Sequence, residues 1–139
     1  MVEDAKAKGA RVLCGGETPE GPGYYYPATV IDHLTDDMRL VMEEAFGPVA
    51  TIYRVKDREE AIKVANQTTF GLSSAIWSQD KAEQDYFIEH LQAGAVFVNG
   101  MTISYPELAF GGIKDSGFGR ELSDAGIKEF CNLKTVWKA

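Results

Sequence analysis

The sequence Glu43-Glu44-Ala45-Phe46-Gly47-Pro48-Val49 lies where a helical pattern gives way to a β-branched one. Gly47 permits backbone conformations that other residues avoid, and Pro48 fixes φ and donates no hydrogen bond. We therefore expect a turn that presents the Glu44 carboxylate and the Phe46 ring together. Such a pair suits a polar ligand with hydroxyl groups and a flat ring. The same residues also fit a plain helix end that carries surface glutamates.

The residues before this turn predict a helix, two extended segments and a second helix. Glu3–Lys8 has the pattern of a helix end, Ala10–Cys14 that of a short buried strand, and Tyr25–Leu34 that of a longer extended run. Thr35 is a favourable N-cap residue, and the two aspartates after it occupy the turn where a helix dipole favours negative charge. We expect this second helix to lead directly into Glu44 and Phe46.

The residues after the turn alternate between strand and helix patterns. The predicted strands are Val49–Val55, Leu72–Trp77 and Ala95–Asn99. A helix that starts at Asp57 and a helix over Gln79–Gln92 separate them, each with a stripe of apolar residues. This order is typical of βαβ units and predicts an α/β fold with a parallel sheet.

The last third of the sequence has no clean period over Gly100–Gly119. Its glycines, in Phe110-Gly-Gly-Ile-Lys-Asp-Ser-Gly-Phe-Gly-Arg-Glu121, match neither a P-loop nor a Rossmann fingerprint. They therefore indicate tight turns and close packing rather than a phosphate cradle. Ser123 is predicted to cap a short helix through Phe130, and Leu133–Trp137 alternates as a final strand would.

The composition narrows the possible partners. A formal net charge of −7 and a pI of about 4.8 argue against nucleic acid or an anionic membrane, since both select a basic face. No apolar run is long enough to span a bilayer, and the first residues lack a secretory profile, so we expect a cytoplasmic protein. Cys14 and Cys131 are expected to be buried structural thiols. Neither the cysteines nor the two histidines have zinc-site spacing.

Four segments in this order carry a family resemblance. They are Glu43–Val49, Ala65–Ala75, Gly94–Asn99 and Phe110–Glu121. Together they resemble the carboxy-terminal portion of the NAD(P)-dependent aldehyde dehydrogenase superfamily, from about residue 9 to the end of the chain. The tail Glu129-Phe-Cys-Asn-Leu-Lys-Thr-Val-Trp-Lys138 is most similar to the succinate-semialdehyde dehydrogenase branch.

The resemblance implies NAD or NADP as cofactor, a small aldehyde as substrate and roles for four residues. Glu44 matches the glutamate that binds the ribose hydroxyls beside the nicotinamide, and a carboxylate can accept from two hydroxyls at once. Phe46 matches the aromatic residue beside the nicotinamide ring. Phe110 matches a wall of the aldehyde tunnel, preceded by Ala109 where many relatives have proline. Ser104 falls where a serine meets the distal carboxylate of succinate semialdehyde, or is an ordinary loop serine.

The departures from the family pattern imply an incomplete enzyme. The nucleophilic cysteine of the family lies in a Gly-Gln-x-Cys context that this sequence lacks, and the general base and Rossmann domain precede the matched region. Residues 1–130 would then form part of the catalytic domain, and residues 131–139 an oligomerisation strand. We expect a chain that is inactive alone and that associates through Leu133–Trp137 or with the preceding portion. The alternatives are a stand-alone structural or interaction module, and a nucleotide-binding domain of unrelated chemistry.

Overall fold

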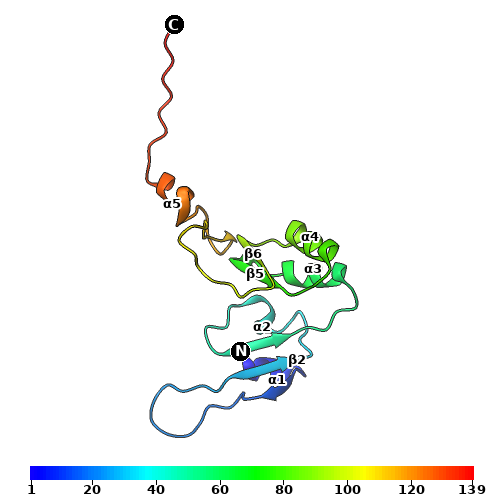
Figure 1. Ribbon diagram of the computed structural model, residues 1–139. Helices are drawn as coiled ribbons and strands as arrows, with labels where there is room; N and C mark the ends of the chain where they lie inside the picture. Colours follow the sequence, from blue (N-terminus) through cyan, green and yellow to red (C-terminus); the bar gives the residue numbers. More distant parts are fainter. The chain divides into compact units, whose positions relative to one another are not determined.

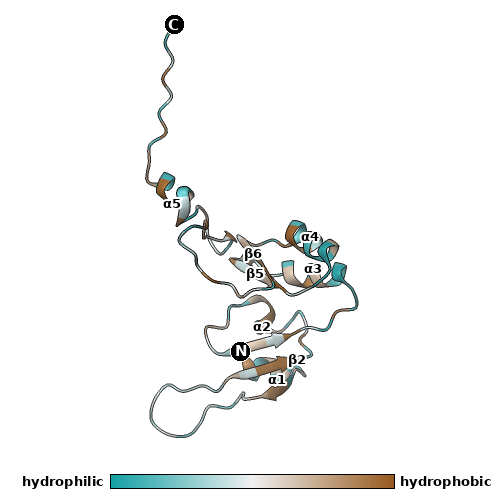
Figure 2. Ribbon diagram, in the orientation of Figure 1, coloured by the Kyte–Doolittle hydropathy of each residue, from teal (hydrophilic) through white to brown (hydrophobic).

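The computed structural model describes residues 1–139 as two compact units, Met1–Lys56 and Asp57–Ala139. Each unit combines short helices with short strands (Figure 1), which confirms the predicted α/β class. Apolar residues concentrate on the strands, whereas the helices of the second unit are largely hydrophilic (Figure 2). No helix is long and apolar enough to cross a membrane.

The first unit is a three-stranded sheet with two helices. Its elements are α1 (Val2–Ala7), β1 (Arg11–Cys14), β2 (Thr29–Asp32), α2 (Arg39–Met42) and β3 (Val49–Ile52). Strand β2 is central, antiparallel to β1 and parallel to β3, so β2, α2 and β3 form a βαβ unit. The sequence predicted βαβ units only among the later strands, and β3 does not pair with β5 as that prediction required. The buried core of this unit joins one strand to both helices, through Val2, Ala5, Ile31, Met38 and Leu40.

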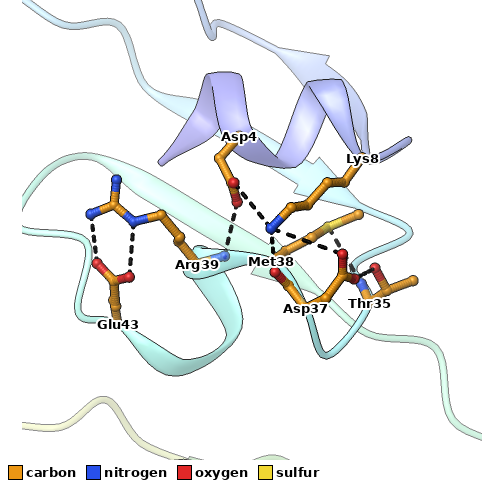
Figure 3. Close-up of polar contacts among 7 residues, drawn as sticks. All are labelled: Asp4, Lys8, Thr35, Asp37, Met38, Arg39 and Glu43. Carbon is orange, nitrogen blue, oxygen red and sulfur yellow. Dashed lines mark hydrogen bonds and ion pairs between the residues drawn. The ribbon is translucent and has the colours of Figure 1, made fainter.

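The expected helix start at Thr35 is wrong. Helix α2 begins only at Arg39, with Met38 as its N-cap residue in an extended conformation. The Thr35 hydroxyl donates instead to the Asp37 carboxylate, at 2.5 Å. The Asp4 carboxylate of α1 accepts the Arg39 backbone N–H at 3.0 Å (Figure 3). Asp4 therefore caps helix α2 from another helix. A local capping rule cannot foresee a donor–acceptor pair 35 residues apart.

The prediction that β1 is buried is also wrong. Only Val12 of this strand is partly buried, because β1 is an edge strand with a single neighbour. Cys14 is therefore exposed, and so is Cys131 in the second unit, which contradicts their interpretation as buried thiols. Both thiols are free.

Asp32 ends β2 as a buried carboxylate that Arg11 binds with two hydrogen bonds, of 3.0 and 2.7 Å, while His33 lies 2.8 Å from it. The Arg11 hydrogen bonds, followed by that of His33, hold the pKa of Asp32 well below its ordinary value of 3.8. A lowered folded-state pKa stabilises the fold above the unfolded-state pKa, and this contribution disappears as the pH falls towards the folded-state value.

We therefore expect the difference in unfolding free energy between the native chain and Asp32→Asn to be largest above about pH 5 and to shrink towards about pH 2. Urea unfolding at a series of pH values measures this difference. The comparison with Asp32→Asn isolates Asp32, because other carboxylates with lowered pKa, such as Asp4 and Glu43, are present in both proteins. A difference that does not change with pH would contradict the assignment.

The second unit contains a βαβ unit and a glycine-rich loop. Its elements are α3 (Arg58–Asn66), β4 (Phe70–Gly71), β5 (Ser73–Ile76), α4 (Lys81–His90), β6 (Ala95–Val98), β7 (Ile113–Lys114) and α5 (Ser123–Glu129). Strands β5 and β6 are parallel and joined through α4, whereas β4 and β7 pair separately and antiparallel. The chain thus forms three small sheets rather than one continuous parallel sheet.

The predicted helix start at Asp57 is confirmed, whereas α4 begins at Lys81 rather than at Gln79, and the N-cap residue of α5 is Leu122 rather than Ser123. The predicted buried stripes are only partly buried. The Asp57 side chain accepts the Glu60 N–H at 2.8 Å, as a capping residue should, and Asp80 does the same for α4. No residue of α3 or α4 is fully buried within this unit. Asn66 joins the two helix ends, because its amide donates to His90 O and accepts from Gln92 N–H, each at 2.8 Å.

The glycine cluster serves close packing, as the sequence predicts. A Cβ on Gly94 would lie 1.8 Å from the carbonyl oxygen of Gly111, and a Cβ on Gly112 would lie 2.5 Å from Ser116. Ser116 in turn accepts the Gly71 N–H at 2.9 Å. The Lys114 ammonium donates to the carbonyls of Asn66, the last residue of α3, and of Thr68, both at 3.0 Å. Lys114 therefore has a structural role.

The carboxy-terminal residues do not form the expected strand. Helix α5 ends at Glu129, and residues 133–137 are exposed and belong to no sheet (Figure 1). A strand requires a hydrogen-bonded neighbour, and no segment of the chain pairs with this one. The side chains of Leu133 and Trp137 are 97% and 82% exposed, so an apolar edge is left uncovered.

Candidate functional site

The segment Glu43–Val49 turns sharply between α2 and β3. Glu43 is extended, with φ −104° and ψ 142°, and ends the helix abruptly. Two narrow turns follow, in which the Gly47 N–H donates to Ala45 O at 2.7 Å and the Val49 N–H donates to Gly47 O at 2.8 Å. The glycine and the proline thus produce the turn that the sequence predicts.

Glu44 and Phe46 are the two side chains that this turn presents outward. Ala45 between them packs against the core, which directs its neighbours away from the core. Phe46 is 95% exposed, an unusual state for a phenyl ring. Glu44 is exposed as well, and its carboxylate makes no hydrogen bond or ion pair within the chain. Both predicted cofactor-binding residues are therefore free to contact a ligand.

Glu43, the other acidic residue of the pair, is used within the chain. Arg39 donates two hydrogen bonds to its carboxylate, of 2.8 and 2.7 Å (Figure 3). These bonds keep the pKa of Glu43 below its ordinary value. The two adjacent glutamates thus differ in role, since one is paired and the other is available.

An apolar hollow of about 400 Å³ adjoins the Phe46 ring within the first unit. It is lined by Met1, Val2, Tyr24, Tyr26, Leu40, Ala45, Phe46, Gly47, Pro48 and Val49. Its walls offer aromatic and aliphatic surface and no ionised side chain. This surface can receive the flat ring of a ligand. Glu44, which is close to Phe46 in the sequence, supplies acceptors for the hydroxyl groups of the same ligand.

The predicted substrate-side residues lie in the second unit. Phe110 is half-buried and is fixed by two backbone hydrogen bonds with Glu121, both of 2.8 Å. It lines a second hollow of about 400 Å³, together with the residues of β6 and Ile103, Tyr105, Leu108 and Ala109. Ser104 lies between two of these residues but is exposed and does not line the hollow.

The structure brings one pair of predicted residues together and leaves the other pair apart, because Phe110 lines the second hollow and Ser104 does not. Glu44 and Phe46 are neighbours on one turn of the first unit, and Phe110 and Ser104 belong to one loop region of the second. Sequence reasoning missed Arg39, although its spacing of four residues from Glu43 is the ordinary signal of a helical ion pair. It also missed Asp4, for which the local sequence holds no signal.

Comparison with known proteins identifies the class to which this fold and site belong. The model of the aldehyde dehydrogenase family matches residues 1–136, and the chain belongs to that family. The chain is 62% identical over 137 residues to the NADP(+) succinate-semialdehyde dehydrogenase 1 of Mycobacterium ulcerans, covering 99% of this chain and 30% of the relative.

Solved structures agree with this family assignment. An NAD-dependent aldehyde dehydrogenase from Sinorhizobium meliloti is 40% identical, with a TM-score of 0.88, and the match covers 93% of this chain and 26% of that one. The protein Gox0499, whose structure concerns cofactor and substrate selection, is 39% identical with a TM-score of 0.93, covering 99% of this chain and 30% of that one. The chain thus spans about 30% of the length of the M. ulcerans relative.

Proposed function

We propose that this chain forms the carboxy-terminal portion of an NAD(P)-dependent aldehyde dehydrogenase that oxidises succinate semialdehyde to the carboxylate. The observation that carries the proposal is the turn Glu43–Val49, which presents a free carboxylate and a ring that is 95% exposed. The 62% identity to an NADP(+) succinate-semialdehyde dehydrogenase supports the substrate and the cofactor. Structural relatives with NAD in their names keep NAD as the second possibility.

The residues present on the turn fit the ribose and nicotinamide half of the cofactor. The Glu44 carboxylate accepts hydrogen bonds from both ribose hydroxyls, and charge-assisted bonds of this kind are stronger than neutral ones. The exposed Phe46 ring would offer an apolar face to the nicotinamide. When bound, the cofactor supplies the oxidant for the reaction.

The residues of the second unit fit the substrate side. Phe110 forms an apolar wall beside the aldehyde, fixed by its backbone bonds to Glu121. The exposed Ser104 hydroxyl donates to the distal carboxylate of the substrate. The nucleophile, the general base and the Rossmann domain belong to the other portion of the enzyme, so residues 1–139 alone are inactive.

The domain organisation follows the same proposal. Residues 1–130 form part of the catalytic domain, and residues 131–139 form a strand that pairs with a neighbouring subunit or with the other portion. Leu133 and Trp137 expose apolar side chains, and pairing of this segment as a strand with another chain would cover them. The proposed enzyme is a cytoplasmic homo-oligomer that has no nucleic-acid or membrane partner.

Mixing experiments test this proposal. The chain is combined with the part of the M. ulcerans relative that it does not match, and NADPH formation from succinate semialdehyde is followed by absorbance. We expect activity from the mixture and none from either part. Activity of the chain alone would overturn its inactivity, and an inactive mixture would favour a stand-alone module. Light scattering on the same samples tests association, which a monomer at all concentrations would contradict.

A further inference from the structure

The Arg39 side chain fixes the residue at which the Glu44–Phe46 turn begins. Its guanidinium binds both oxygens of Glu43, and the Glu43 N–H donates to Arg39 O at 2.8 Å. Figure 3 shows the two bonds between the side chains. The side chain and the backbone of Glu43 are therefore both joined to the same residue. A planar guanidinium that binds a carboxylate through two bonds restrains its orientation as well as its distance.

Arg39 is in turn held by helix α1. The Asp4 carboxylate accepts the Arg39 backbone N–H at 3.0 Å, and the Lys8 ammonium lies 3.1 Å from the other oxygen of Asp4 (Figure 3). Helix α1 is anchored in the core through Ala5, which is fully buried. A continuous set of contacts thus leads from the core through Asp4 and Arg39 to Glu43.

The far end of the turn is anchored separately. The carbonyl of Pro48 accepts the N–H of Thr29 at 2.8 Å, and Thr29 is a buried residue of the central strand β2. Within the turn itself, the backbone hydrogen bonds run from the Gly47 N–H to Ala45 O and from the Val49 N–H to Gly47 O. The direction of the Glu44 and Phe46 side chains therefore depends on both anchors.

We propose that Arg39, held by Asp4, is a positioning residue for the cofactor site: it fixes Glu43 and thereby the directions of Glu44 and Phe46. This inference rests on the proposed function of Glu44 and Phe46. Arg39 and Glu43 are about half exposed, at 53% and 50%, and such pairs add little to global stability. The effect of Arg39 is therefore on the order of the turn rather than on unfolding.

The first test measures the backbone order of the turn in the 139-residue chain. In Arg39→Met, we expect ¹⁵N relaxation to show increased fast motion of the Ala45, Phe46 and Gly47 amides, with an unchanged urea midpoint. Arg39→Lys, which retains the charge but not the paired geometry, should be intermediate. The double variant R39E/E43R should restore the order.

A matched control removes another exposed ion pair of the same unit. Lys6→Met breaks the bond to Glu3, of 2.8 Å, and should leave the turn amides unchanged. Turn amides that are equally ordered in Arg39→Met and in the native chain would overturn the inference. Loss of order in Lys6→Met as well would also overturn it, because the effect would then not be specific to Arg39.

The second test measures NADP(+) affinity by titration in the mixture of the two portions. We expect the Kd for NADP(+) to rise about fivefold in Arg39→Met and to equal the native value in R39E/E43R. The KM for succinate semialdehyde should be unchanged in both variants. Glu44→Gln distinguishes the two claims. If Glu44→Gln weakens binding and Arg39→Met does not, the positioning role fails. If Glu44→Gln binds as the native chain does, the proposed function itself fails.

Discussion

Replacing Gly94 by alanine is expected to destabilise the second unit by about 3 kcal/mol or more, because the new Cβ would lie 1.8 Å from the carbonyl oxygen of Gly111. The atoms that it meets are backbone, and the Leu72 carbonyl oxygen lies at 3.0 Å on another side. No rotamer change can therefore relieve the overlap. Gly94 and the loop segment that carries Gly111 would have to separate.

Urea unfolding followed by tryptophan fluorescence measures this effect in the relevant unit. Both tryptophans of the chain, Trp77 and Trp137, belong to the second unit. Gly100→Ala is the matched control, since the nearest atom to its Cβ lies at 3.9 Å. We expect the control to change the unfolding free energy by less than about 0.5 kcal/mol. Equal midpoints for the two variants would refute the close packing of Gly94 on the loop.

The sequence was sufficient where short-range rules determine the structure. Asp57 caps its helix within three residues, and the turn at Gly47 and Pro48 follows from the backbone restrictions of these two residues alone. The βαβ order of β5, α4 and β6 was also readable, since apolar periods alternate along the chain. These elements depend on neighbours that the sequence itself places together.

Predictions failed where the deciding partner is distant in the sequence, and the prediction of a strand that needs another chain stays a prediction. The N–H of Arg39 is capped by Asp4, 35 residues away, and this contact delays the helix that Thr35 alone would start. Apolar and polar residues alternate in Leu133–Trp137, as in a strand. A β-ladder also requires a second strand, which this pattern does not specify. Cys14 lies in an apolar segment, yet an edge strand leaves it exposed. Sequence patterns indicate the local conformational preference of a segment. They do not indicate which of its surfaces neighbouring elements bury.

The assignment of Glu44 and Glu43 shows how the structure separates residues that look equivalent in sequence. Both are glutamates in one motif, and the family resemblance implies a role for Glu44. The structure adds a physical reason, because Arg39 already occupies both oxygens of Glu43 while the oxygens of Glu44 are free. A ligand that requires two hydrogen-bond acceptors can therefore obtain them from Glu44 without breaking an existing pair.

Glu44→Gln is expected to raise the Kd for NADP(+) in the reconstituted mixture about 10- to 100-fold. A glutamine retains one acceptor oxygen and places an NH₂ donor where the second ribose hydroxyl would donate, so a charge-assisted bond is lost. Phe46→Ala should raise the same Kd about three- to tenfold, which corresponds to the loss of one aromatic contact. Isothermal titration calorimetry measures both values.

Glu3→Gln is the matched control for charge, because Glu3 is an exposed glutamate of the same unit whose partner is Lys6. It should bind NADP(+) as the native chain does. Neither Glu44 nor Phe46 contributes a contact to the core, so the urea midpoints of all three variants should equal that of the native chain. Unchanged affinity in Glu44→Gln, or an equal loss in Glu3→Gln, would reject Glu44 as the ribose ligand. Weakened binding with an unchanged urea midpoint would show that Glu44→Gln does not act by destabilising the fold, because a loss of global stability would lower both.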